Sequence, residues 1–103
     1  MKIINVDEDN FNEEVINSKQ KVLIDFNATW CGPCKMIGPV LEKIAEQNDN
    51  IKIVSIDVDN NQDLAKEYNV FSIPCLVVVK DGKEIKRNVG LISKNEIEEL
   101  IGE

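Results

Sequence analysis

Trp30-Cys31-Gly32-Pro33-Cys34 is the stretch of this 103-residue chain that decides both its fold and its chemistry. Two cysteines three residues apart on a helix lie on one face, with Cα atoms about 5–6 Å apart, a distance that a disulfide accepts. Gly32 lets the backbone turn, and Pro33 suits a first helical turn because its missing N–H is not needed there. We therefore expect a disulfide that opens and closes without refolding of the chain.

The segments on either side of the cysteine pair indicate two strands joined through a helix. Residues 22–26 and 51–58 are nearly continuous apolar runs, which are typical of strands buried on both faces. Between them, apolar residues recur at helical spacing: Met36, Ile37, Val40, Leu41, Ile44 and Ala45. This order predicts a right-handed parallel crossover, with Cys31 at the N-terminus of its helix.

The rest of the chain continues the alternation of strands and helices. Asn60 precedes a short helical pattern with Asp63 in its first turn. Asp81-Gly82 between two strand-like runs predicts an antiparallel hairpin. Ser93 and Glu96 fit a capping box at the start of a terminal helix. An edge strand near residues 3–6 and a short helix near residues 11–16 are also expected.

The composition limits the size of the protein and its partners. A chain of 103 residues that is 43% hydrophobic should form one domain over residues 1–103. Its net charge of −7 repels nucleic acid and anionic lipid. No stretch approaches the roughly 18 apolar residues of a membrane span, and the N-terminus lacks a signal-peptide core. We expect a cytoplasmic protein with no nucleic-acid or membrane partner.

The helix end should make the two cysteines unequal. Unpaired N–H groups and the helix dipole favour a thiolate at Cys31, which would attack a substrate disulfide. Cys34, one turn inward, should be less exposed and should release the product by attacking Cys31. Asp25 is the titratable group in the apolar strand nearby, and it could take the Cys34 proton directly or through one water. Alternatively, Asp25 points outward or pairs with a lysine.

Residues along essentially the whole chain resemble the thioredoxin family. The matching residues, in order, are Asp25-Phe26, Trp30-Cys31-Gly32-Pro33-Cys34-Lys35, Pro39, Ile73-Pro74, Lys80-Asp81-Gly82 and Val89-Gly90. The resemblance implies an α/β thioredoxin-like fold, with a central mixed sheet of four or five strands flanked by four helices. It also implies a cis Pro74 facing the cysteine pair. Thioredoxins are a known case of a cysteine activated by a helix end.

The resemblance further implies a general protein disulfide reductase, an electron-transport protein of cell redox homeostasis. Its electron donor would be a thioredoxin reductase, its partners would be disulfide-containing target proteins, and it would act as a monomer without a cofactor. Whether such a carrier counts as an enzyme is left open. The site would include Lys35, and substrates would dock on a small apolar patch. The patch would consist of Trp30, Gly32, Pro33, Ile73, Pro74, Val89 and Gly90. Taken singly, each apolar member could instead serve packing alone, and Pro39 could mark a helix that starts afresh.

Three residues depart from the family pattern near the site. Asn27 stands where thioredoxins usually carry an aromatic residue, so the packing there is smaller and more polar. Ser55 stands where many thioredoxins have a lysine, and without that cation Asp25 should be harder to ionise. Cys75 follows Pro74 where threonine is usual. It is interpreted either as a small buried residue or as a regulatory thiol.

Two other functions compete with disulfide reduction. A metal-binding module is suggested by the zinc-ligand spacing of Cys31 and Cys34, which Cys75 could approach. Structural zinc generally needs four protein ligands, however, and the chain has no histidine and no second Cys-x-x-Cys, so no metal is expected. A non-catalytic partner-binding subunit would use the same apolar patch. Gly32-Pro33 between the cysteines resembles the reductants of the family, which favours a disulfide reductase.

Overall fold

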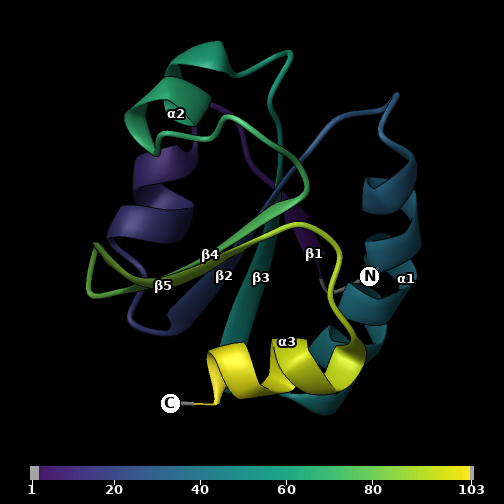
Figure 1. Cartoon of the computed structure of the whole chain (residues 1–103). Coiled ribbons are helices and arrows are strands. Elements are labelled where there is room, and N and C mark those ends of the chain that lie inside the picture. Colours follow the sequence, from purple (N-terminus) through teal and green to yellow (C-terminus); the bar gives the residue numbers. More distant parts are fainter. Residues whose placement is uncertain (1–2, 103) are drawn as a thin grey trace.

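The computed structural model describes residues 3–102, and a twisted five-stranded sheet forms the centre of this part of the chain (Figure 1). The sheet has the order β1-β3-β2-β4-β5, in which β1, β3 and β2 are parallel and β4 and β5 are antiparallel to their neighbours. The strands are β1 (Ile3–Asn5), β2 (Lys21–Asn27), β3 (Ile51–Asp57), β4 (Cys75–Lys80) and β5 (Lys83–Val89). The mixed sheet, with β1 at one edge, is confirmed.

Four helices among the described residues cover the two faces of the sheet (Figure 1). They are the short π-helix η1 (Asn12–Ile16), α1 (Gly32–Gln47), α2 (Gln62–Glu67) and α3 (Lys94–Ile101). The buried residues of η1 and α2 pack on one face of the sheet, and those of α1 and α3 pack on the other. No helix within residues 3–102 is both long enough and apolar enough to cross a membrane.

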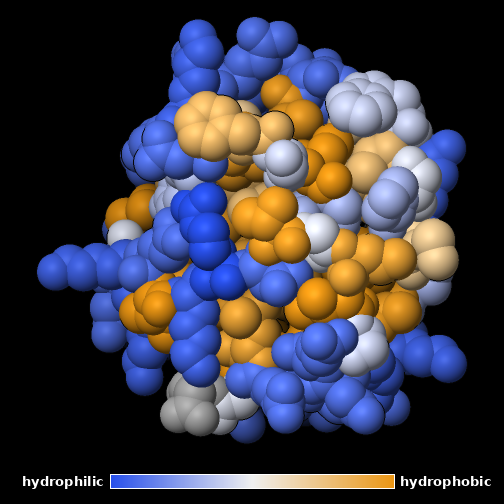
Figure 2. Space-filling view, in the orientation of Figure 1, coloured by the Kyte–Doolittle hydropathy of each residue, from blue (hydrophilic) through white to orange (hydrophobic). Residues whose placement is uncertain are grey.

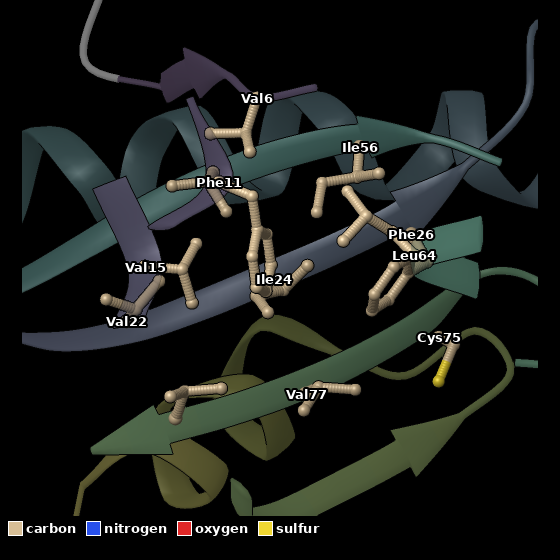
Figure 3. Packing of buried hydrophobic residues seen from close by; sticks show 12 residues of the cluster. Val6, Phe11, Val15, Val22, Ile24, Phe26, Ile56, Leu64, Cys75 and Val77 are labelled. Atoms are coloured by element: carbon tan, nitrogen blue, oxygen red, sulfur yellow. The ribbon is translucent and has the colours of Figure 1, made fainter. Parts of the chain in front are cut away.

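Successive residues of β2 point to opposite faces of the sheet, and this alternation places Asp25. Val22, Ile24 and Phe26 are fully buried against η1 and α2, where Figure 3 shows them among the other side chains of that layer. Leu23 belongs to the layer beneath α1 and α3. Because side chains in a strand alternate with a period of two, Asp25 shares the α1 face with Leu23.

Local signals set the ends of most elements as predicted. Asp81 and Gly82 both have positive φ angles, 53° and 79°, which the tight turn between β4 and β5 requires. The predicted start of α2 is one residue early, because Asn61 and not Asn60 precedes its first turn. The Asn61 side chain does not cap α2, since it accepts from the Glu8 N–H and donates to the Asp57 carbonyl. The alternative of a helix that starts at Pro39 is wrong, because α1 runs through this residue.

The capping box at α3 gives a direct test of the folded C-terminal layer. The Ser93 hydroxyl accepts from the Glu96 N–H at 3.2 Å, and the Glu96 carboxylate accepts from the Ser93 N–H at 2.9 Å. Ser93→Ala should lower the free energy of unfolding by about 1 kcal/mol, measured by urea denaturation, because it leaves an N–H of the first turn without its partner. Glu96→Gln should change little, since glutamine also closes the box. Equal losses in the two variants would contradict this assignment.

Candidate active site

A disulfide joins Cys31 and Cys34 at the first turn of α1, with Cα atoms 5.3 Å apart. Cys31 has an extended backbone (φ −90°, ψ 112°) and occupies the N-cap position, so the helix begins directly after it. Its Sγ accepts a hydrogen bond from the Cys34 N–H at 3.2 Å. That N–H has no partner within the helix, and a negative sulfur at Cys31 would strengthen the bond. The predicted position of Cys31 at a helix N-terminus is therefore confirmed.

The expected difference in exposure between the two cysteines is wrong for the disulfide form. Cys31 is 4% exposed and Cys34 is 6% exposed. Both are buried because they pack with Ala28 and against the half-buried side chains of Val58 and Ile73. The cysteines are therefore unequal through their position relative to the helix end, and their exposure does not distinguish them.

Asp25 is buried in the middle of β2, with Ser55 of β3 and Leu76 of β4 as its neighbours in register. Its side chain is 6% exposed in total, and its Oδ1 atom has no hydrogen-bond partner among the described residues. Burial raises the pKa of Asp25 from 3.8 to about 6, against a smaller lowering by the Asn27 side chain. Neither an outward orientation nor an ion pair with a lysine fits this environment, and the expected rise in pKa is confirmed.

A small cavity brings Asp25 and Cys34 together between the sheet and the start of α1. Its volume is about 210 Å³, and it is lined by Asp25, Asn27, Ala28, Cys34, Lys35, Gly38 and Ser55. Such a space is large enough for water, and several of its walls are polar. The arrangement allows a proton to pass between the Cys34 sulfur and the Asp25 carboxylate through water.

The residues expected to dock substrates lie around the cysteine pair. Ile73 packs against the pair, and the Ile73-Pro74 peptide bond is cis. The Gly90 N–H donates to the Pro74 carbonyl at 2.8 Å, which holds the end of β5 beside this bond. Trp30 and Val89 are 69% and 54% exposed, whereas Pro74 is buried.

Two exposed apolar residues beside this site were not predicted from the sequence. Phe71 is 89% exposed in the segment before β4, and Leu91 is 46% exposed just after β5. Figure 2 shows apolar, orange side chains along this part of the surface, over the segment leading into β4, the end of β5 and the nearby part of α1. The sequence places Phe71 two residues before Ile73, which indicates that it lies near the patch but does not indicate its exposure.

Cys75 lies on the face of the sheet away from Cys34. It is fully buried in the layer of η1 and α2, where Figure 3 shows its sulfur at the start of β4. Burial is also the main cause that raises the pKa of the Cys75 thiol. Packing therefore accounts for Cys75. Within residues 3–102, no three side chains of the His, Cys, Asp and Glu types gather in a way that could hold a metal ion.

Comparison with known proteins connects this geometry to a family. The family model described as Thioredoxin matches residues 2–103. The chain belongs to the thioredoxin family. A thioredoxin of Bacillus subtilis is 48% identical over 102 residues, which cover 98% of this chain and 96% of that protein. A thioredoxin of Chlamydia trachomatis is 45% identical over 96 residues, 93% of this chain and 92% of the relative.

A longer relative and a solved structure extend the comparison with thioredoxins. A bifunctional thioredoxin reductase/thioredoxin of Mycobacterium leprae is 46% identical over 92 residues, which are 88% of this chain and 20% of that protein. The structure of a mutant thioredoxin from Halobacterium salinarum is similar with a TM-score of 0.90 at 38% identity. The match covers 97% of this chain and 88% of that one. The thioredoxin-like fold is thus shown, with the redox-active pair in the motif typical of the family.

The raised pKa of Asp25 predicts how stability depends on pH. A carboxyl with a higher pKa in the folded chain binds its proton more tightly there, so stability is greatest below about pH 4 and falls as the pH rises to about 6. Above that range the loss is on the order of 3 kcal/mol. Asp25→Asn should therefore be more stable than the unmodified oxidised protein at pH 8 and similar to it at pH 4, by urea denaturation.

Asp9→Asn is the matched control, because it makes the same change in net charge at an exposed position. It should show no such gain between pH 4 and pH 8. A stability difference between Asp25→Asn and the unmodified protein that is the same at both pH values would contradict the burial of an ionisable Asp25.

Proposed function

We propose that this chain is a general protein disulfide reductase that cycles between a Cys31/Cys34 dithiol and a disulfide. The observation that carries the proposal is the position of the pair: Cys31 begins a helix, and Cys34 shares a cavity with a buried carboxyl group, Asp25. Family membership supports the same reaction. The chain's own residues supply the nucleophile, the resolving thiol and a proton acceptor.

The reaction has two sulfur transfers. The Cys31 thiolate attacks one sulfur of a target disulfide, a mixed disulfide forms, and the other target sulfur leaves as a thiolate that takes up a proton. Cys34 then gives its proton to Asp25 and attacks the Cys31 sulfur, so the Cys31–Cys34 disulfide forms as the mixed disulfide breaks. The second target sulfur leaves as a thiolate and takes up a proton, and Asp25 returns its own proton to solvent. The target has gained two electrons and two protons, and the chain is left with the disulfide seen here.

Return to the dithiol requires two electrons from a partner, for which we propose a thioredoxin reductase. The Mycobacterium leprae relative supports this choice, because its name joins a thioredoxin reductase and a thioredoxin in one protein. The proposed site of action is the cytoplasm, where thiols are kept reduced, and the free thiol of Cys75 suits such a compartment. In this scheme the protein is a monomeric electron carrier.

Cysteine variants test the two roles. In a protein-disulfide reduction assay with dithiothreitol as the donor, Cys31→Ser and Cys34→Ser should both lose turnover. Only Cys34→Ser should trap the target as a mixed disulfide, detected by mass spectrometry, because its Cys31 still attacks. Cys75→Ala is the matched control and should retain turnover, since Cys75 lies on the opposite face of the sheet. Trapping by Cys31→Ser would reverse the assignment.

The docking patch is tested by two exposed residues of the same strand. Val89 lies at the end of β5 near the cysteine pair, and Ile85 lies near the other end of β5. Val89→Asp should raise KM for a protein disulfide about fivefold or more, as expected from a loss of roughly 1 kcal/mol of binding. Ile85→Asp should not, and neither variant should slow reduction of a small aromatic disulfide. Equal effects of the two variants would exclude a patch centred on Val89.

A further inference from the structure

Arg87 of β5 makes a fork of hydrogen bonds on the face of the sheet that η1 and α2 cover. Its Nε and Nη2 atoms donate to the two oxygens of the Glu84 carboxylate, at 2.6 and 2.8 Å. Nη2 also donates to the Tyr68 carbonyl at 2.6 Å, and Nη1 donates to the Asn69 carbonyl at 3.5 Å. One half-buried guanidinium group therefore joins β5 to the end of α2.

A bulge in β5 brings Glu84 and Arg87 to the same face of the sheet. Residues three apart in a regular strand point to opposite faces, because side chains alternate with a period of two. Here the pairing with β4 shifts between Val78 and Val79, which leaves one extra residue in β5 and resets the alternation. Glu84 and Arg87 thus both lie opposite valines of the layer of η1 and α2, Val79 and Val77. The bulge therefore directs Arg87 toward the end of α2.

The end of α2 presents carbonyl groups that the helix itself does not use. Asn69 has a positive φ of 54°, and the Val70 N–H donates to the Ala65 carbonyl at 2.8 Å, as in a helix that ends with a left-handed residue. The carbonyls of Tyr68 and Asn69 accept no backbone N–H among residues 3–102. A cation is favourable at this end of a helix. Arg87 supplies it and so fixes the point at which the chain leaves α2.

The chain that leads from α2 into β4 passes the cysteine pair with few hydrogen bonds of its own (Figure 1). No backbone hydrogen bond within the described part of the chain involves residues 71–73. Phe71 is 89% exposed, and the last residue of the three packs against the cysteines. The segment is held at its two ends, by Arg87 before it and by the Gly90 N–H, which donates to the Pro74 carbonyl, after it. Both anchors come from β5 or the residue that follows it.

We propose that Arg87 is a positioning residue for target binding, which holds residues 71–73 beside the cysteine pair in the conformation that targets meet. The inference rests on the proposed function, because it concerns how target proteins dock at that same site. A segment that is already fixed loses less conformational entropy on binding, so the complex is favoured. Arg87 should therefore affect the binding of targets and leave the sulfur chemistry unchanged.

The first test is amide hydrogen exchange of the oxidised protein, followed by NMR. Arg87→Met keeps an unbranched apolar side chain but removes every donor. The Val70 N–H should then exchange about fivefold faster or more, because the end of α2 loses its hydrogen bonds to a charged group. An unchanged rate at Val70 would overturn the proposal. This measurement needs no target, so its outcome is independent of whether the protein reduces other proteins, which the cysteine variants test separately.

The second test separates target binding from chemistry. In the reduction of a protein disulfide with dithiothreitol as the donor, Arg87→Met should raise KM about threefold or more, with kcat near its original value. Reduction of a small aromatic disulfide should keep its rate, since such a substrate does not need the docking segment. An unchanged KM, or an effect confined to kcat, would overturn the proposal.

Lys52→Met is the matched control, because it removes the same kind of contact near the start of β3, away from the redox site. The Lys52 ammonium donates to the carbonyl and to the carboxylate of Glu14 in η1, both at 3.1 Å. Its loss should lower the melting temperature and leave both the Val70 exchange rate and KM unchanged. A rise in KM as large as that of Arg87→Met would indicate a general loosening of the fold and would overturn the specific role of Arg87.

Discussion

The site depends on one constraint, which is that helix α1 begins directly after Cys31. The crossover from β2 to β3 brings this helix end to the carboxyl ends of two parallel strands, where the chain leaves the sheet. The first turn then presents an N–H to the Cys31 sulfur and places Cys34 one turn further, in the wall of the cavity. If the helix began elsewhere, the Cys31 sulfur would lose the N–H that makes it differ from Cys34. Cys34 would also no longer line the cavity that contains Asp25.

The site also requires a buried carboxyl group, and its burial lowers the stability of the folded chain at neutral pH. Asp25 must lie on the α1 face because the residues on either side of it, Ile24 and Phe26, fill the opposite layer. An aliphatic residue there would give a more stable sheet at neutral pH, so the acid is an example of stability given up at a functional site. The cavity beside Asp25 is large enough to admit water, which reduces this cost without removing the raised proton affinity that the proposed reaction uses.

Much of this molecule follows from local sequence signals, and the remainder depends on register. The β2 and β3 strands, the Asp81-Gly82 turn and the start of α1 at Cys31 were predicted because each is determined by a few adjacent residues. The equal burial of the two cysteines was not predicted, because the residues that cover them, Ile73 and Val58, come from distant parts of the chain. Likewise, only the alignment of β2 with β3 brings Asn27 to Ser55, and nothing local indicates that Phe71 stays exposed.

The central claim is that position at a helix end, and not exposure, makes the two cysteines unequal. The most direct test is competitive alkylation of the reduced protein at pH 7 with a limiting amount of iodoacetamide, followed by mass mapping of each cysteine. The account predicts that Cys31 is modified well before Cys34 and Cys75, although Cys31 and Cys34 are almost equally buried in the disulfide form. Equal modification of Cys31 and Cys34, or faster modification of Cys34, would contradict it.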